Sequence, residues 1–318
     1  MKRTVVIVHP GALGDVLLAV PALWQLRAQH PQHQLVLCAK DSIARLLLEC
    51  KVIDGWASIE GGAWADVYDP DAPLTGELKN WLSCCDRAIV WIQDEKGNLA
   101  AALRKAGARS TIVSSPFAMD LKTTHQSDRF CEIAQVSPAS LISFKQLQLP
   151  GEMRSLGAVC LGDAGMLVDQ SLVAIHPGSG SPLKSVGVRT MARMIAKIQG
   201  EGLIPIVIEG PADREAVRNL LGEIPSPMTV LQALDLRTLA GVLSHVRLFV
   251  GHDSGVTHLA ALLGVQTVAF FGPTDPERWA PLGKHVTVIK WAPSSVYDMM
   301  SFHELPIALG PTTHPNGY

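Results

Sequence analysis

The stretch that decides the fold is residues 246–279, VRLFVGHDSGVTHLAALLGVQTVAFFGPTDPERW. The apolar residues 248–250 predict the end of a buried strand, and the β-branched run at 265–271 predicts a second one. Between them, Ser254 is a good helix N-cap, and residues 255–263 have the apolar spacing of a helix. A strand–turn–helix–strand unit of this kind predicts a parallel sheet in an α/β protein.

The turn before this helix has the features of an anion-binding site. A helix start leaves its first amides unpaired and carries the positive end of the dipole, so it attracts a phosphate. The predicted donors are the amides of Gly255, Val256, Thr257 and His258. Asp253 stands beside them and should face sugar hydroxyls, because it would repel a phosphate. A plain helix cap formed by Ser254 is the alternative, and it is compatible with phosphate binding.

The rest of the chain repeats the alternation of strands and helices. In the first half, strands are expected at 4–8, 35–38, 88–92 and 110–113, and helices at 15–29, 42–49, 98–106 and 129–135. In the second half, further strands are expected at 172–175, 203–208 and 286–289, and helices at 189–199, 213–221 and 236–244. Residues 137–170 mix Pro, Gly and short apolar pieces. We therefore predict an N-terminal Rossmann-like domain at 1–168, a C-terminal one at 169–293 and a loose tail at 309–318.

Composition excludes several classes of protein. The 318 residues suffice for two domains, and a formal net charge of −2 gives no reason to expect nucleic-acid binding. No apolar run approaches the roughly 20 residues that a membrane span needs. Six cysteines without a Cys-x-x-Cys pair predict a reduced, cytoplasmic protein.

Two glycine-containing loops also follow predicted strands. Residues 11–15, GALGD, open a helix, and Asp15 in its first turn would repel a pyrophosphate while the helix dipole favours its ionised form. This turn is therefore suited to present a base, and the alternative is a tight turn with an acid at the helix start. Residues 176–184, HPGSGSPLK, have the small residues, hydroxyls and lysine of a phosphate cradle, and the alternative is a flexible surface loop.

Four stretches together resemble glycosyltransferase family 9, the bacterial heptosyltransferases of lipopolysaccharide core assembly. They are residues 11–16 GALGDV, 176–184 HPGSGSPLK, 253–259 DSGVTHL and 271–276 FGPTDP. The resemblance implies an α/β fold of the GT-B kind, with two facing Rossmann-like domains, parallel sheets and an inter-domain cleft. It also implies that a helix at about 294–308 packs back on the first domain.

The resemblance further implies an inverting transfer of a sugar from a nucleotide-sugar donor to an acceptor hydroxyl. The donor would be ADP-heptose, the acceptor a lipopolysaccharide-type or other glycan or glycolipid, and no metal or other cofactor would be required. Asp15 would be the general base and Lys184 would stabilise the leaving diphosphate. The implied donor-binding residues are Gly178, Ser179, Gly180, Ser181, Glu215, Leu234, Asp253, Ser254, Gly255, Val256, Thr257 and His258.

Some features leave alternatives open. Residues 52–78 contain six acids and no Lys or Arg, where an anionic lipid acceptor would require positive charge. A sugar-nucleotide epimerase on the same fold, or a non-catalytic nucleotide-sugar-binding protein, would need no such acceptor. His252 and His258 are expected to form hydrogen bonds in preference to binding a metal, and Asp69–Asp71 reads as a turn. A lipid acceptor would require peripheral contact with the inner face of the membrane, and the oligomeric state stays open.

Overall fold

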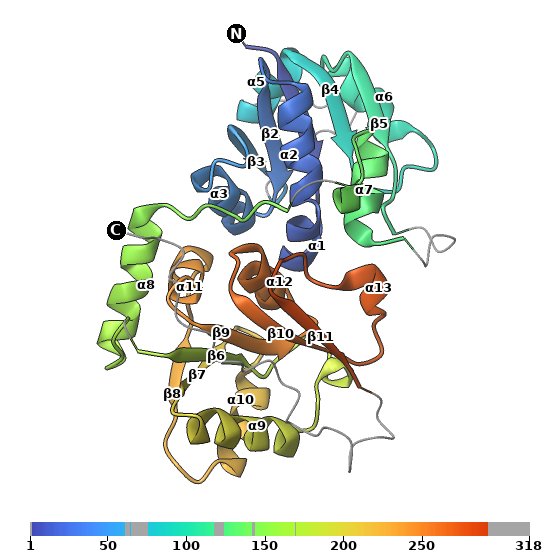
Figure 1. The fold of residues 1–318 in the computed structure, drawn as a ribbon. Coiled ribbons are helices and arrows are strands. Elements are labelled where there is room, and N and C mark those ends of the chain that lie inside the picture. The colour runs from blue at the N-terminus through green and yellow to red at the C-terminus, as the bar shows by residue number, and fades with distance from the viewer. Residues whose placement is uncertain are drawn as a thin grey trace.

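The computed structural model describes residues 2–60, 64, 76–117, 124–141, 144–168 and 170–291. Within them the chain forms two parallel β-sheets with helices on both faces, which confirms the predicted α/β class (Figure 1). The helix predicted at 294–308, the tail at 309–318 and the turn at 69–71 lie outside the described residues. Among the described residues, no helix combines the length and the apolar character of a membrane span.

The first sheet has the strand order β3-β2-β1-β4-β5, with parallel neighbours throughout. Its strands are β1 (Thr4–Val8), β2 (Gln34–Ala39), β3 (Gly55–Ser58), β4 (Cys85–Val90) and β5 (Ser110–Val113). Its helices are α1 (Leu13–Leu18), α2 (Val20–Gln29), α3 (Asp41–Glu49), α5 (Gly76–Ser83), α6 (Asn98–Lys105) and α7 (Gln126–Ala134). The strand β1 is buried along its whole length, because Val5 and Ile7 pack into one apolar core and Val6 and Val8 into another.

The second sheet has the order β11-β10-β9-β6-β7-β8 and is also parallel. Its strands are β6 (Leu172–His176), β7 (Ile204–Glu209), β8 (Thr229–Gln232), β9 (Leu248–His252), β10 (Gln266–Phe271) and β11 (Val286–Lys290). Its helices are α9 (Val188–Gly200), α10 (Arg214–Glu223), α11 (Leu236–Leu243), α12 (Gly255–Leu262) and α13 (Pro276–Trp279). Residues 246–279 therefore form β9-α12-β10-α13. The two strands and the helix between them are as predicted.

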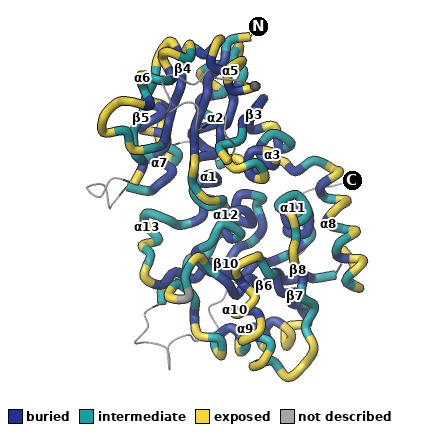
Figure 2. Tube along the Cα trace, turned by 180° about the vertical axis from the view of Figure 1, so that it is seen from behind, coloured by how far each residue is buried: buried dark blue, intermediate teal, exposed yellow. Residues whose placement is uncertain are grey.

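The two halves meet through helices. Figure 1 shows α1 of the first half directly above α12 of the second, and the two helices pack on each other. One apolar core is continuous across this contact, since it contains Leu17 and Leu18 of α1 together with Leu259 and Leu262 of α12. Figure 2 shows the strands of both sheets buried and the outer turns exposed. Both faces of each sheet are thus covered, and the junction between the two halves is part of the apolar core.

One predicted helix is wrong, and one helix was not predicted. The helix expected at 15–29 is two helices, α1 and α2, separated at Ala19, because Pro21 lacks the N–H that a continuous helix would need there. Residues 137–170, where no element was predicted, contain α8 (Gly151–Asp163), which packs on α11. Its buried residues Met153, Gly157 and Leu161 lie four apart, and the glycine in the middle hides the apolar stripe. The domain boundary after residue 168 stays a prediction.

Candidate active site

The start of α12 is a capped helix end. Ser254 has an extended backbone, and its Oγ accepts a hydrogen bond from the Thr257 amide at 3.5 Å. The His258 amide donates to the Ser254 carbonyl at 3.2 Å. The prediction that Thr257 and His258 offer free amides is therefore wrong, because the capping side chain bonds the first and the first helical backbone bond takes the second. Within the described chain, the amides of Gly255 and Val256 remain for a ligand.

A charged cluster stands beside this helix start. Lys184 Nζ lies 2.7 Å from Asp253 Oδ2, and His258 Nε2 lies 3.9 Å from Asp253 Oδ1. Burial raises the pKa of Asp253, but the contacts with His258 and Lys184 outweigh burial and hold this pKa at about 2. Asp253 is thus an anion at neutral pH, and it keeps the Lys184 ammonium group next to the residues that precede α12.

The loop between β6 and α9 is shaped by its own hydroxyl groups. Ser179 Oγ lies 3.0 Å from Ser185 Oγ and also contacts the Ser181 carbonyl. The Lys184 amide donates to the same carbonyl at 2.9 Å, which closes a short 3-10 turn at Pro182–Lys184. Gly180 is exposed at the tip. These bonds give the loop a defined course that brings Lys184 to Asp253.

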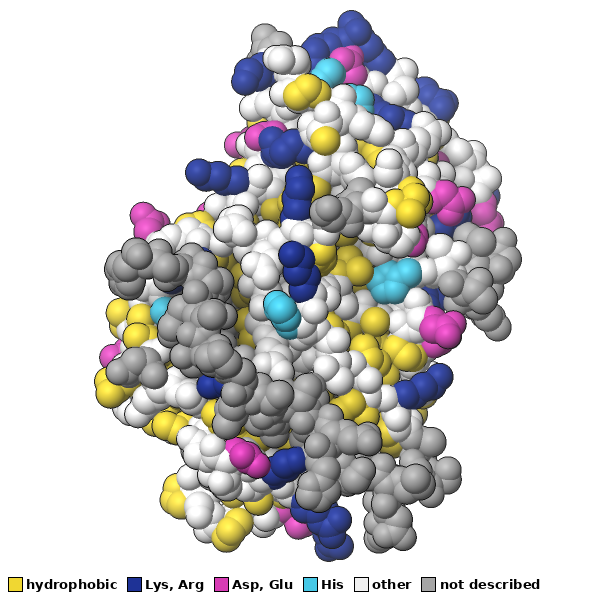
Figure 3. Space-filling view, in the orientation of Figure 1, with side chains coloured by type: hydrophobic (Ala, Val, Ile, Leu, Met, Phe, Trp, Pro, Cys, Tyr) yellow, Lys and Arg dark blue, Asp and Glu magenta, His cyan; other side chains and the backbone are white. Residues whose placement is uncertain are grey.

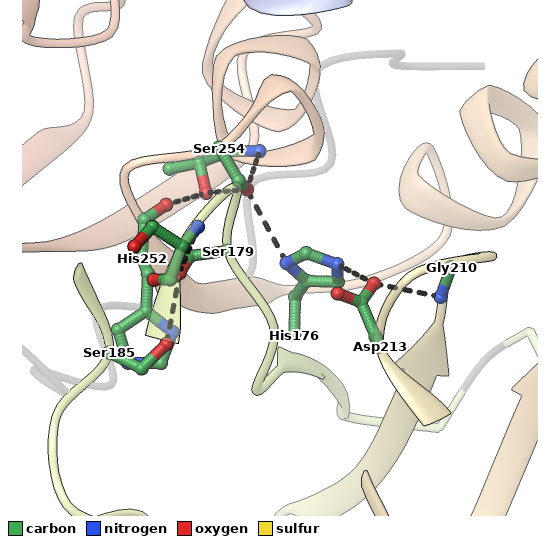
Figure 4. A network of polar contacts seen from close by, with 9 residues as sticks. His176, Ser179, Ser185, Gly210, Asp213, His252 and Ser254 are labelled. Atoms are coloured by element: carbon green, nitrogen blue, oxygen red, sulfur yellow. Dashed lines mark hydrogen bonds and ion pairs between the residues drawn. The ribbon is translucent and has the colours of Figure 1, made fainter. Parts of the chain in front are cut away.

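A buried pair lies behind this loop (Figure 4). His176, the last residue of β6, contacts Asp213 Oδ2 through Nε2 at 2.9 Å, and its Nδ1 lies 3.4 Å from Ser254 Oγ. The Gly210 amide donates to Asp213 Oδ2 at 3.0 Å. Burial raises the pKa of Asp213, but the contacts with His176 and with this amide bring it below its usual value. A Cβ on Gly178 would lie 1.7 Å from Asp213 Oδ1, so only glycine lets the loop pass so close.

In the first half, Asp15 occupies the first turn of α1. Its Oδ2 accepts a hydrogen bond from the Ala12 amide at 3.2 Å. The turn is compact, because a Cβ on Gly11 would lie 2.6 Å from the His9 ring and 2.9 Å from Asp15 Cβ. We expected the helix start to favour the ionised carboxylate, but burial outweighs that effect and raises the pKa of Asp15. A carboxylate with a raised pKa is a stronger base once it is ionised.

The two helix starts touch each other. A Cβ on Gly255 would lie 2.9 Å from Leu13 Cβ and 3.1 Å from the Gly14 nitrogen. The pKa of Asp15 accordingly responds to charges of the second half: His258 and Lys184 lower it and Asp253 raises it. In the described chain, a carboxylate on one side therefore faces a helix start with two unbonded amides and a lysine on the other. This arrangement suits a reaction in which a proton is taken on one side of a bond and negative charge develops on the other side.

Comparison with known families identifies the chain. A family model described as Glycosyltransferase family 9 (heptosyltransferase) matches residues 101–301, which is more than half of the sequence. The chain belongs to glycosyltransferase family 9. It is accordingly a glycosyltransferase, and the resemblance inferred from its four short stretches is confirmed.

Several proteins of known description are similar to this family 9 chain. Lipooligosaccharide heptosyltransferase 2 of Campylobacter jejuni is 22% identical over 287 residues, which cover 86% of this chain and 82% of the relative. A glycosyltransferase family 9 structure from Veillonella parvula superposes with a TM-score of 0.76 at 22% identity, covering 91% and 86% of the two chains. The structure of ADP-heptose lps heptosyltransferase II of E. coli gives 0.72 at 18% identity, covering 93% and 94%. These structures confirm the predicted GT-B fold.

Two of the residues predicted to bind the donor lie apart from the charged cluster. Glu215 is exposed in the first turn of α10, and Leu234 is half-buried between β8 and α11. Asp213, two residues before Glu215, is the buried acid that reaches the loop of the family 9 chain. The roles of Glu215 and Leu234 stay predictions.

Sequence reasoning gave no role to three buried polar residues of the site, His9, His176 and Asp213. His9 follows β1 directly, its Nδ1 accepts a hydrogen bond from the Gly11 amide at 3.0 Å, and burial lowers its pKa to about 3. His176 ends β6 in the same way. The signal that could have found both histidines is a polar residue at the carboxyl end of a buried strand. Asp213 had no such signal, because it follows a turn after β7.

The histidine expected to form hydrogen bonds does so. His252 Nε2 accepts a hydrogen bond from the Val186 amide at 3.0 Å, and burial lowers the pKa of His252 to about 4. This bond ties the end of β9 to the loop that carries Lys184. Over the described ranges, no group of three or more His, Cys, Asp and Glu side chains is placed to hold a metal ion.

Proposed function

We propose that this glycosyltransferase moves heptose from ADP-heptose to a hydroxyl of a lipopolysaccharide-type acceptor, with inversion at the anomeric carbon. The observation that carries the proposal is the contact between the starts of α1 and α12, which sets Asp15 opposite Lys184, Asp253 and His258. The description of the E. coli structural relative as an ADP-heptose lps heptosyltransferase supports the choice of donor and acceptor.

The donor diphosphate would lie against the second half. The Gly255 and Val256 amides would donate to its oxygens, and Lys184 would supply a positive charge that Asp253 holds in place. Ser179, Gly180 and Ser181 would border it in the loop. As the sugar–oxygen bond breaks, negative charge grows on the diphosphate, and these groups stabilise it. We therefore propose that the reaction requires no metal ion.

Asp15 would act on the acceptor. Its carboxylate takes the proton of the acceptor hydroxyl, the hydroxyl oxygen forms the new bond to the anomeric carbon, and the bond from that carbon to the diphosphate breaks. Nucleophile and leaving group lie on opposite sides of the carbon, so the configuration inverts. The raised pKa of Asp15 matches a residue that must first hold and then release this proton.

Part of the acidic stretch at 52–78 is neutralised where the structure describes it. Asp54 accepts a hydrogen bond from the Leu35 amide at 2.8 Å and lies 3.0 Å from Arg27. Glu60 accepts from the Asp41 amide at 3.3 Å. The charge of Asp54 is thus paired with Arg27, whereas Glu60 and the exposed Glu77 have no cation beside them among the described contacts. We propose that the acceptor is lipid-linked, which would bring the protein to the inner face of the membrane.

The test is a transfer assay with ADP-heptose and heptose-deficient lipopolysaccharide. Replacing Asp15 by Asn should lower the transfer rate by ~10²–10⁴-fold, because general-base catalysis is lost. ADP affinity, measured by calorimetry, should stay within about twofold, since the carboxylate does not contact the diphosphate. Glu152→Gln, an exposed first-turn acid of α8, is the matched control and should leave both quantities unchanged.

Two results would contradict the proposal. Equal losses of ADP affinity and of transfer in Asp15→Asn would make Asp15 a structural residue. Conversion of ADP-heptose without any acceptor would instead indicate an epimerase-like reaction.

A further inference from the structure

The buried His176–Asp213 pair has no assigned part in the reaction, although it adjoins the start of α12. Both side chains are more than nine-tenths buried. If the pair only completed the hydrogen bonds of its own two side chains, the second ring nitrogen of His176 would need no contact with another residue. Here the second ring nitrogen of His176 faces the Ser254 hydroxyl at 3.4 Å (Figure 4).

The direction of each hydrogen bond follows from the chemistry of the groups. An ionised carboxylate only accepts, so the proton on His176 must sit on Nε2, which faces Asp213. A ring that carries its proton on Nε2 alone has an acceptor at Nδ1, and the Ser254 hydroxyl faces that atom. Thr257 Oγ1 donates its own proton to the His252 carbonyl. It lies 3.0 Å from Ser254 Oγ and can accept a hydrogen bond from that hydroxyl. The Ser254 hydroxyl can therefore donate to His176 Nδ1 or to Thr257 Oγ1, while its oxygen accepts from the Thr257 amide.

Asp213 extends this chain to two further segments. It accepts the Gly210 amide at the end of β7, and it fills the space that a side chain on Gly178 would need. One carboxylate thus fixes the Lys184 loop, the turn before α10 and, through His176, the cap of α12. These are the segments that surround the proposed diphosphate.

We propose that Asp213 and His176 are positioning residues that set the Ser254 hydroxyl, and with it the start of α12, for the donor diphosphate. The inference rests on the proposed function and adds a reason why diphosphate affinity depends on residues that do not touch the ligand. Preformed groups of this kind lower the ordering cost of binding.

Two substitutions of His176 separate its two contacts. In His176→Gln, the side-chain amide can reach the position of Nε2 and keep the contact with Asp213, but Ser254 Oγ loses its ring-nitrogen partner and keeps only its described contacts with Thr257. In His176→Asn, the shorter amide can occupy the position of Nδ1 and keep the contact with Ser254. His245→Gln and His245→Asn are matched controls, because His245 Nε2 bonds only to a backbone carbonyl, that of Arg154, at 2.8 Å.

The experiment measures the affinity of the full chain for ADP and for inorganic pyrophosphate, with thermal melting to confirm folding. His176→Gln should weaken both ligands by about three- to tenfold, the loss expected for one hydrogen bond, and His176→Asn by much less. In a Ser254→Ala background, His176→Gln should cause no further loss, because its effect passes through that hydroxyl. Asp213→Asn is a second variant and should resemble His176→Gln.

The other possible outcomes would overturn the positioning role, the donor assignment or both. Equal losses in the Asn and Gln variants, or a full loss for His176→Gln in the Ser254→Ala background, would overturn the positioning role and leave the proposed function standing. Wild-type binding of pyrophosphate without ADP would overturn the donor assignment alone. Binding of neither ligand by folded wild-type protein would overturn both proposals.

Discussion

At the residue scale, the pKa of Asp15 connects the two halves of the molecule. Burial raises this pKa, while Lys184 lowers it and Asp253 raises it from across the contact. If Asp15 is the base, kcat/KM rises with pH as Asp15 ionises, and the midpoint of that rise reports the pKa of Asp15 in the free enzyme.

Two charge-removing variants should move this midpoint in opposite directions. Lys184→Met removes a positive charge that favours the carboxylate, so the midpoint should shift to higher pH. Asp253→Asn removes a negative charge that disfavours it, so the midpoint should shift to lower pH. The measurement is a pH profile of kcat/KM for each variant, whatever its absolute rate. Shifts in the same direction, or none, would show that Asp15 does not face the cluster.

Residue by residue, the sequence was informative where local backbone rules act. Helix chemistry predicts Ser254 as an N-cap, and turn chemistry predicts a tight turn at Gly11. The structure contains both the cap and the turn. The Lys184–Asp253 ion pair joins residues 69 positions apart, and no local rule relates them. The His176–Asp213 pair and the raised pKa of Asp15 depend in the same way on burial, which only the folded chain defines.

At the element scale, α8 and α11 form a contact that requires two glycines. A Cβ on Gly157 would lie 2.1 Å from the Gly241 carbonyl carbon, and a Cβ on Gly241 would lie 2.1 Å from the Met153 carbonyl oxygen. Each helix therefore lies directly on the backbone of the other. This close approach explains how α8 packs against α11 although its buried face has few large apolar residues.

Gly157→Ala should lower the free energy of unfolding by ~1–3 kcal/mol, because the added methyl group forces two backbones apart. Gly162→Ala in the same helix is the control, since a Cβ there meets no atom within 4 Å. It should be neutral or raise the free energy of unfolding by about 0.5–1 kcal/mol, as alanine favours helix over glycine. Urea unfolding of both variants measures the difference, and equal effects would show that the close helix contact is absent.

Two strands and one helix break were not predicted. β3 and β8 are four-residue strands at the edges of their sheets, too short to show a period. The break between α1 and α2 was visible as Pro21, but the apolar spacing on both sides favoured one helix. The central strands were predictable because burial on both faces makes them continuously apolar.

At the scale of the whole molecule, polar residues near the carboxyl ends of strands in both sheets lie at the junction between the two halves. In the first half, His9 follows β1 and Asp15 lies in α1; in the second, His176 ends β6, and Asp253 and Ser254 follow β9. Further contacts cross the junction away from these residues: His125 Nε2 lies 3.1 Å from the Ala280 carbonyl, and Arg237 Nη2 lies 2.9 Å from Glu49 Oε2. Figure 3 shows the face of the molecule on which the two halves adjoin, with histidine and apolar side chains between them. The two halves are thus held together at several points around Asp15 and the start of α12.

The glycine contact at the centre of this junction gives the last prediction. In Gly255→Ala, the new methyl group would point at the first half, where Leu13 Cβ at 2.9 Å and the Gly14 nitrogen at 3.1 Å must give way. The start of α1, and Asp15 with it, should move by a few tenths of an ångström from the donor site. Since a misplacement of 1 Å can cost ~10²-fold in rate, we expect a loss of transfer of about tenfold. ADP affinity should stay within about twofold, because alanine keeps the backbone amide at position 255 and its methyl group points at the first half. Gly222→Ala in α10, where a Cβ meets nothing within 4 Å, is the matched control for both assays. Unchanged transfer in Gly255→Ala would mean that catalysis does not depend on this contact, whereas a parallel loss of ADP affinity would place the damage in the donor site itself.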